Sequence, residues 1–174
     1  MFRLQIYWLL HDVICVFQGA VIFGHRPKMI SERVSKWTYG VSCTRTYEEG
    51  VHPANRKYIN TDGLTKVDGL FSLHVNEGQQ LKIDDVQSEK TYQMATADLD
   101  GVTVFFHASK NKSPMFVDEP GCYRVGRLDV SVPGKGRERE VVVTMSFGKT
   151  EVEGSATVKA TGEITRTTLD FLDM

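Results

Sequence analysis

Apolar and polar residues alternate with a period of two along most of the chain after Lys36. This alternation is typical of strands that have one buried face and one solvated face, as in antiparallel sheets. The predicted strands cover residues 36–43, 71–75, 101–108, 127–132, 141–147, 151–159 and 163–172. The pattern therefore predicts a mainly β fold over residues 36–174, and the number of short strands favours an antiparallel β-sandwich.

Glycine and proline mark the turns between these strands, because glycine reaches positive φ and proline fixes φ in advance. Two tight hairpins are expected, one at Gly148-Lys149 and one at Thr161-Gly162. Residues 48–67 are less regular.

The first 35 residues have a different pattern, and we expect them to form a separate N-terminal helical segment, residues 1–35. Residues 4–23 are the one strongly apolar stretch, and its apolar side chains recur at helical spacing at Val13, Val16, Phe17 and Ala20. Gly24 and Pro27 would end this helix, and a further helical turn is expected at residues 28–34.

Two other interpretations of the apolar stretch stay open. Arg3, the apolar run at residues 6–10 and the small residue Ala20 are compatible with a signal peptide, which would make the protein secreted. A membrane span would place His11 and Asp12 in its middle, where ionisable groups are costly. The buried helix is the favoured interpretation, and with it a cytoplasmic protein without membrane association.

Composition narrows the class of partner. The chain has 174 residues, 41% of them apolar and 25% charged, with 21 Lys and Arg against 22 Asp and Glu. This balance gives no basic field for nucleic acid or an anionic membrane. The three cysteines, Cys15, Cys43 and Cys122, are far apart and form no C-x-x-C motif, so we expect reduced thiols.

No motif for catalysis is visible. Gly148-Lys149-Thr150 lacks the earlier glycine of a phosphate loop, since Val143 stands at that position. The five histidines are scattered and predict no metal site. We expect His74 to lie on the solvated side of its strand and residues 135–140 to form an exposed hairpin tip. The residues predict a binding or interaction domain that is not an enzyme.

Several ordered segments resemble the heat shock 70 kDa protein 12A and 12B group, divergent members of the seventy-kilodalton heat-shock chaperone family. The segments that carry the resemblance are residues 19–24 (GAVIFG), 33–41 (RVSKWTYGV), 49–53 (EGVHP), 116–121 (FVDEPG), 126–128 (GRL), 145–152 (MSFGKTEV) and 168–172 (TLDFL). The resemblance covers about residues 12–172, whereas residues 1–11 match nothing in that group, as expected for part of a longer protein.

The resemblance implies an ATPase domain followed by a β-rich substrate-binding part. Residues 12–24 resemble the last helix of the ATPase domain, and residues 37–172 resemble the β part. The phosphate-binding and adenosine-binding segments would precede this chain, so ATP and Mg²⁺ are cofactors implied for the longer relatives alone. We expect this chain by itself to hold no cofactor and neither to bind nor to hydrolyse ATP.

The resemblance also implies a client site. Two loops would hold an extended apolar peptide or protein client, the first at residues 44–50 and the second at residues 94–101. The candidate client contacts are Thr44, Tyr47, Met94 and Ala95. A helical lid is not expected, and the ATPase domain is a further implied partner. The alternative function is a scaffold that contacts one specific partner and no unfolded client.

Overall fold

The computed structural model describes residues 32–83, 85–148 and 151–170. The predicted helix within residues 4–23 lies outside these ranges, as does most of the predicted segment 1–35. The helical turn expected at residues 28–34 is wrong in its described part, because Glu32–Val34 is strand β1 and pairs antiparallel with β5 (Gln80–Lys82). Val34 and Gln80 are partners in that ribbon.

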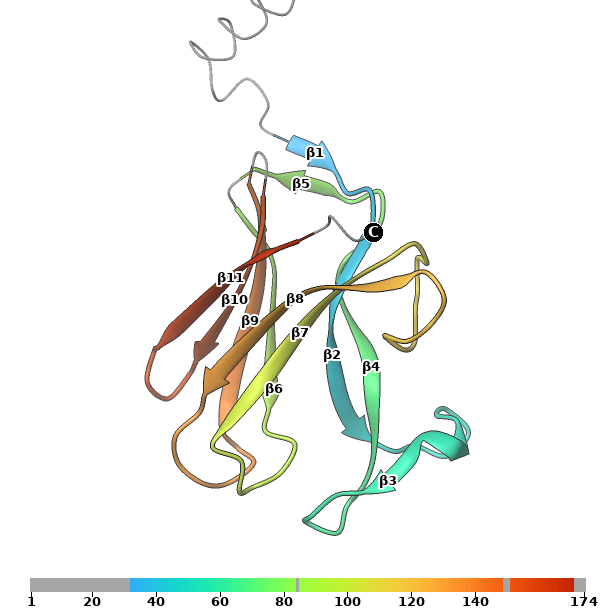
Figure 1. The fold of residues 1–174 in the computed structure, drawn as a ribbon, viewed down its shortest axis with the longest axis vertical. Helices are drawn as coiled ribbons and strands as arrows, with labels where there is room; N and C mark the ends of the chain where they lie inside the picture. The colour runs from blue at the N-terminus through green and yellow to red at the C-terminus, as the bar shows by residue number, and fades with distance from the viewer. Residues whose placement is uncertain (1–31, 84, 149–150, 171–174) are drawn as a thin grey trace, which may run out of the picture. The chain divides into compact units, whose positions relative to one another are not determined.

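Two larger antiparallel sheets make up the rest of the described chain (Figure 1). The first has the order β3-β4-β2-β7-β8, with β3 (Lys57–Ile59), β4 (Thr65–Val75), β2 (Thr38–Thr46), β7 (Gly101–Ser109) and β8 (Cys122–Ser131). The second has the order β11-β10-β9-β6, with β11 (Ile164–Leu169), β10 (Val152–Val158), β9 (Glu140–Phe147) and β6 (Val86–Gln93). A 3-10 turn, η1 (Ala54–Arg56), precedes β3.

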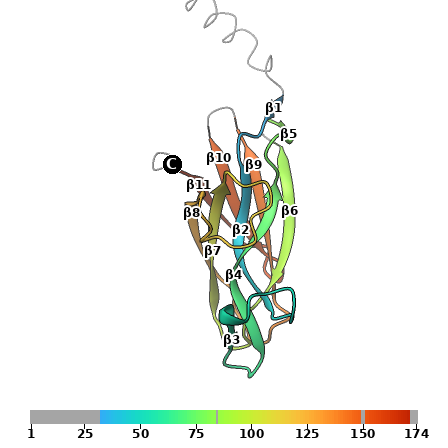
Figure 2. The ribbon, with the colours of Figure 1, turned by 90° about the vertical axis from the view of Figure 1, so that its right-hand side faces the viewer.

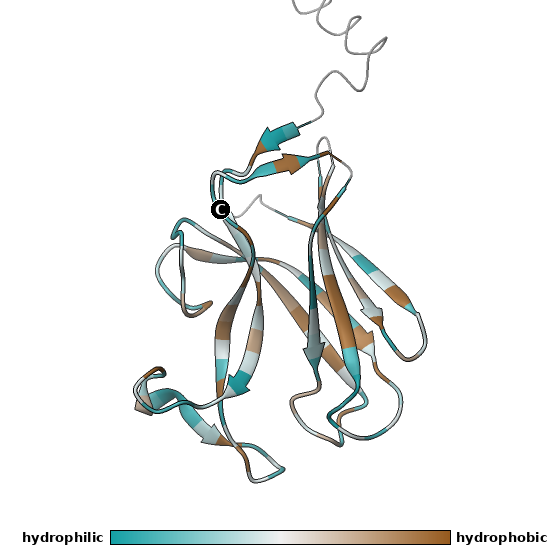
Figure 3. Cartoon of the chain, turned by 180° about the vertical axis from the view of Figure 1, so that it is seen from behind, coloured by the Kyte–Doolittle hydropathy of each residue, from teal (hydrophilic) through white to brown (hydrophobic). Residues whose placement is uncertain are grey.

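Both sheets contribute to one hydrophobic core, which confirms the predicted β-sandwich. Phe106 of β7, Met145 of β9 and Val158 of β10 are each at most 1% exposed and belong to the same cluster. Gly154 of β10 leaves the space that the Phe106 ring occupies, so the two layers meet closely there. Hydrophobic residues recur along the strands of both sheets (Figure 3), as the alternating sequence predicts.

The two predicted hairpins are present in the second sheet. Phe147 pairs with Val152 across the β9–β10 connection, whose residues 149 and 150 lie outside the described ranges. The β10–β11 turn contains Gly162 with φ of 72°, and its N–H donates to the Val158 carbonyl at 2.8 Å. A residue with positive φ closes a tight turn at low cost when it is glycine.

Strand β2 separates from β7 partway along its length, and this separation positions the candidate site. The two strands pair from Thr38 with Ser109 to Val41 with Phe106, and β2 then continues to Thr46 beside β4 alone. Irregularities in the β2–β4 register and in the β7–β8 register lie near the point of separation. Such bulges bend a strand and increase its twist. Figure 2 shows β2 beside β4, with β3 and the β1–β5 ribbon at opposite ends.

Within the described ranges, no helix has the length and hydrophobicity needed to cross a membrane.

Candidate functional site

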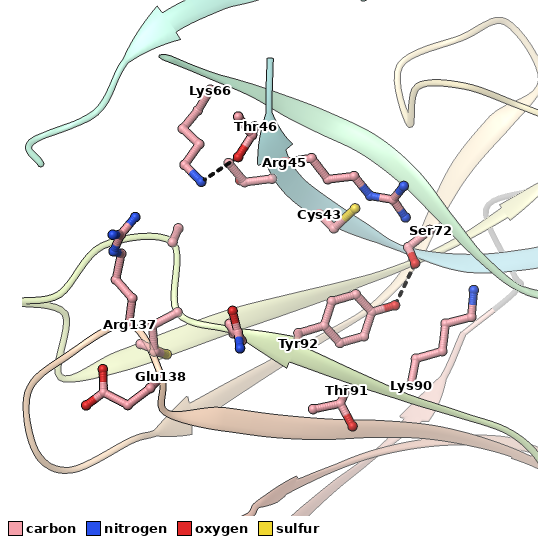
Figure 4. Close-up of a pocket in the computed structure, with 14 residues that line it drawn as sticks. Cys43, Arg45, Thr46, Lys66, Ser72, Lys90, Thr91, Tyr92, Arg137 and Glu138 are labelled. Atoms are coloured by element: carbon pink, nitrogen blue, oxygen red, sulfur yellow. Dashed lines mark hydrogen bonds between the residues drawn. The ribbon is translucent and has the colours of Figure 1, made fainter. Parts of the chain in front are cut away.

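A polar cavity of about 870 Å³ opens between β2 and β4 on one side and β6 on the other (Figure 4). Thr44 and Arg45 come from β2, Lys66 from β4, and Lys90 from β6. The loop between β8 and β9 adds Arg137 and Glu138, and Figure 4 shows Lys66 and Lys90 extending toward the cavity from opposite walls. We use the name cleft for this outer cavity and the deeper cavity that adjoins it.

A second cavity of about 290 Å³ continues between β2 and β7 toward the core. It shares part of its wall with the outer cavity, from Cys43 and Thr44 to the segment Tyr92–Ala95. Its remaining lining is largely apolar and comes from both sheets: Val41, Val102, Val104, Val141 and Val143. This inner cavity, called the slot below, therefore suits small apolar side chains.

Two strand edges face the slot. Residues 42–46 of β2 pair with β4 but not with β7, and residues 101–105 of β7 pair with β8 but not with β2. Among the described residues, no other backbone group pairs with these two edges. Backbone N–H and C=O groups at such edges are available to an added strand.

A hydrogen-bonded bridge joins the β3–β4 loop to the loop that follows β6, beside the cleft. The Asn60 side-chain amide donates to the Ala95 carbonyl at 3.2 Å, and the Asn60 Oδ1 accepts from the N–H groups of Asp62 and Leu64. An asparagine that bonds its own following backbone fixes a turn in this way. Asp62 also pairs with Arg137 at 3.6 Å. Four connected residues thus hold together three loops that surround the cleft.

Arg139 fixes the second loop from behind. Its guanidinium donates to the carbonyls of Ala97, Val132 and Gly136 at 3.0, 2.6 and 2.8 Å. The side chain is 8% exposed, so the expectation of a fully exposed tip at residues 135–140 is wrong at this position. The reason is that a buried guanidinium can satisfy several carbonyls that no strand partner reaches.

A buried polar network connects β4 to β6 at the inner wall of the cleft. The Tyr92 hydroxyl donates to Ser72 Oγ at 2.7 Å, and His74 lies 2.9 Å from both Tyr92 Oη and Ser88 Oγ. Because Tyr92 has one proton to donate, its oxygen accepts from His74 Nε2–H, and His74 Nδ1 accepts from Ser88.

The expected solvation of His74 is therefore wrong. His74 is 7% exposed, because β6 of the opposite sheet covers the side of β4 that the alternation marks as polar. Burial, with a smaller contribution from the positive charge of Lys90, lowers the pKa of His74 to about 4. Burial also raises the pKa of Tyr92 to about 12. Both side chains are therefore neutral at physiological pH, which lets them hydrogen-bond inside the sandwich.

The predicted client contacts take different positions. Thr44, Met94 and Ala95 line both cavities of the cleft, whereas Tyr47 lines neither and packs near His52, with ring centroids 6.0 Å apart. Thr44 donates to Asp68 Oδ1 at 2.9 Å, and Met94 is 5% exposed within the core. The structure brings Thr44, Met94 and Ala95 together, although Thr44 lies in β2, which continues to Thr46, and not in a loop. Their role in client contact stays a prediction.

Sequence reasoning missed the cations of the cleft. Arg45, Lys66, Lys90 and Arg137 are distant in sequence and meet only through the sheet topology. One signal was available, since Lys90 and the preceding residues of β6 form a polar run that leads into the second loop. Burial raises the pKa of Cys43 at the inner wall, while Arg45 and Lys90 act against that rise. Both cations therefore lie close to the same wall.

No group of three or more His, Cys, Asp or Glu residues in the part of the chain that is described could hold a metal ion. The arrangement has the features of a binding cleft: an apolar floor, available strand edges, a bridged mouth and polar walls.

The chain is similar to heat shock 70 kDa protein 12A. It is 27% identical to that protein from Mus musculus and from Homo sapiens over 165 residues, which is 92% of this chain and 24% of each relative. Heat shock 70 kDa protein 12B from Homo sapiens is 26% identical over 176 residues, 93% of this chain and 25% of the relative. The resemblance seen in the sequence motifs is thereby confirmed. No family model matches the chain. The chain spans about a quarter of the length of the curated relatives it matches.

Proposed function

We propose that the described sandwich binds an extended segment of a client protein in the cleft, as the substrate-binding β part of a heat shock 70 kDa protein 12A-like chaperone. The relatives are heat shock 70 kDa proteins by name, and the resemblance to that group implies the chaperone class. The two sheets with their cleft offer a place for a client. The longer protein would couple this site to an ATPase domain.

The observation that carries the proposal is the separation of β2 from β7 beyond Val41. An extended segment entering there meets residues 42–46 on one side and residues 101–105 on the other. Backbone hydrogen bonds to such edges give affinity independent of sequence, and pockets for alternate side chains give selectivity. In the slot, Val102 and Val104 would contact the inward side chains of the segment.

The test is fluorescence anisotropy with a labelled nonapeptide of alternating valine and glutamine. We expect saturable binding to the full chain, and about a tenfold weaker affinity for Ala95→Trp, because the indole would occupy the mouth shared by both cavities. Ala160→Trp is the matched control, since Ala160 is exposed in the turn after β10 and lines neither cavity.

Unchanged affinity in Ala95→Trp would contradict the cleft as the binding site. Absence of binding by the unmodified chain, together with failure to slow aggregation of a heat-denatured enzyme, would favour the scaffold function. Circular dichroism melts of both tryptophan variants establish that each remains folded before affinities are compared.

We also propose that this chain has no nucleotide turnover of its own. Support comes from the flanks of Gly148-Lys149-Thr150, where Phe147 and Val152 pair as hairpin strands, because a phosphate loop instead joins a strand to a helix. A phosphate-release assay with Mg²⁺ and ATP checks this. A rate of release above that of buffer, in the same fractions as the purified chain, would contradict it.

A further inference from the structure

The walls of the outer cavity carry more positive than negative charge. Arg45, Lys66, Lys90 and Arg137 line it, and among the described residues that line it Glu138 is the one carboxylate. These four cations come from four separate segments, β2, β4, β6 and the β8–β9 loop. The chain as a whole has a net charge of −1, so the positive charge is a local property of the cleft.

Most of this charge is available to a ligand. Arg45, Lys66 and Lys90 form no ion pair with any residue in the described ranges, and the Lys66 ammonium donates only to the Thr46 hydroxyl, at 3.3 Å. Arg137 is paired with Asp62. Of the described residues that line the slot, Asp68 is the one that is charged, and Thr44 and the Gly69 N–H both donate to its carboxylate.

The two cavities differ in the side chains that they suit. The outer walls are cationic, whereas Val102, Val104, Val141 and Val143 line the slot. Successive side chains of an extended segment point to opposite sides and repeat every second residue. A segment lying along the β2 edge would therefore present one set of side chains to the slot and the other set to the cations.

We propose that the cleft selects extended protein segments in which acidic side chains alternate with small apolar side chains. This inference rests on the proposed function and names its substrate class. Complementary charge favours such segments and disfavours basic ones. A protein segment suits the slot better than a nucleic acid does, because the slot combines apolar side chains with strand edges that pair with peptide backbone.

The experiment compares three labelled nonapeptides in which valine alternates with glutamate, glutamine or lysine. We expect the glutamate peptide to bind at least about tenfold more tightly than the glutamine peptide, and the lysine peptide not to bind. Raising NaCl from about 50 mM to about 500 mM should weaken binding of the glutamate peptide more than binding of the glutamine peptide, since salt screens charges at the surface of the cleft.

Lys66→Glu/Lys90→Glu should reverse the preference, so that the lysine peptide binds and the glutamate peptide no longer binds. Lys82→Glu/Lys112→Glu makes the same change in net charge at exposed lysines outside both cavities and should leave the preference intact.

Equal affinity for the glutamate and glutamine peptides, lost in Ala95→Trp, would overturn the acidic preference and leave the proposed function standing. No binding of any of the three peptides would overturn both. Displacement of the glutamate peptide by single-stranded polyuridine at lower concentration than by unlabelled peptide would assign the cations to RNA and also overturn the inference.

Discussion

The side-chain amide of Asn60 donates a hydrogen bond to the backbone carbonyl of Ala95 at 3.2 Å, and this bond joins the two loops on either side of the cleft. Asn60 also organises its own turn through Asp62 and Leu64. Ala95 lines both cavities, so we expect the bridge to influence how fast a ligand leaves the cleft.

Replacing Asn60 with alanine should therefore speed release of a bound peptide. We expect a several-fold higher dissociation rate in stopped-flow anisotropy and a stability loss of about 1 kcal/mol, since one bridge and two turn bonds are removed. Asn55→Ala is the matched control, because Asn55 is exposed within η1. An unchanged dissociation rate in Asn60→Ala would mean that the bridge does not limit release.

Arg139 should be the most sensitive charged residue for stability. Arg139→Met removes the donor to the carbonyls of Val132 and Gly136, and it leaves the Ala97 carbonyl with the Gly136 N–H alone. We expect a loss of about 3 kcal/mol in urea denaturation. Arg137→Met should cost less than about 0.5 kcal/mol, because its pair with Asp62 is partly exposed. Similar losses in the two variants would refute the anchoring role of Arg139.

The stability of the sandwich should fall as pH decreases from about 6.5 to about 4. The pKa of His74 is about 4 in the folded state and about 6.5 in the unfolded chain, so the unfolded state binds more protons in this interval and gains stability as pH falls. The loss in unfolding free energy reaches its full value of about 3 kcal/mol below pH 4.

The measurement is urea denaturation at pH 7, 5 and 4 for the unmodified chain and for His74→Gln. Carboxylates and His107 also change protonation in acid, and they do so in both proteins. The informative quantity is therefore the difference in unfolding free energy between the two proteins. As pH falls, the unmodified chain should lose stability relative to His74→Gln. A difference that does not change with pH would show that the pKa of His74 is the same in the folded and unfolded states.

Gly154 should tolerate no side chain. A Cβ there would meet the ring of Phe106, which is fully buried in the opposite sheet. We expect Gly154→Ala to lower the unfolding free energy by about 2 kcal/mol, measured by chemical denaturation. Gly154→Ala/Phe106→Leu should recover part of this loss, because the smaller side chain vacates the space, and absence of any recovery would argue against the contact as its cause.

The sequence predicts the second sheet well where strands that pair with each other are consecutive in the chain. Strands β9, β10 and β11 follow each other through short turns, so alternation and turn residues are sufficient to place them. Strand β6 escapes prediction because most of its residues are exposed beside the cleft or on the outer surface. Its sequence consequently lacks the apolar alternation that marks a half-buried strand.

The candidate site is predictable only in part. Thr44 and Ala95 follow from the positions of the two predicted loops, whereas Asn60 and Lys66 lie within residues 48–67, where the sequence has no regular pattern. His74 illustrates the limit of a period-two pattern, which identifies the polar face of a strand but not whether another sheet covers it. Pairings between distant strands decide such cases, and they are absent from local sequence.

The length of the unpaired edge of β7 limits how many residues of a bound segment it can contact. Residues 101–105 are the portion of β7 that faces the slot without a partner from β2, and five residues of strand extend about 17 Å. Under the proposed function, the footprint on a client would be about five residues, of which two or three would point inward. Discrimination among clients would then be confined to a pentapeptide window, and flanking sequence would matter only through its accessibility and charge.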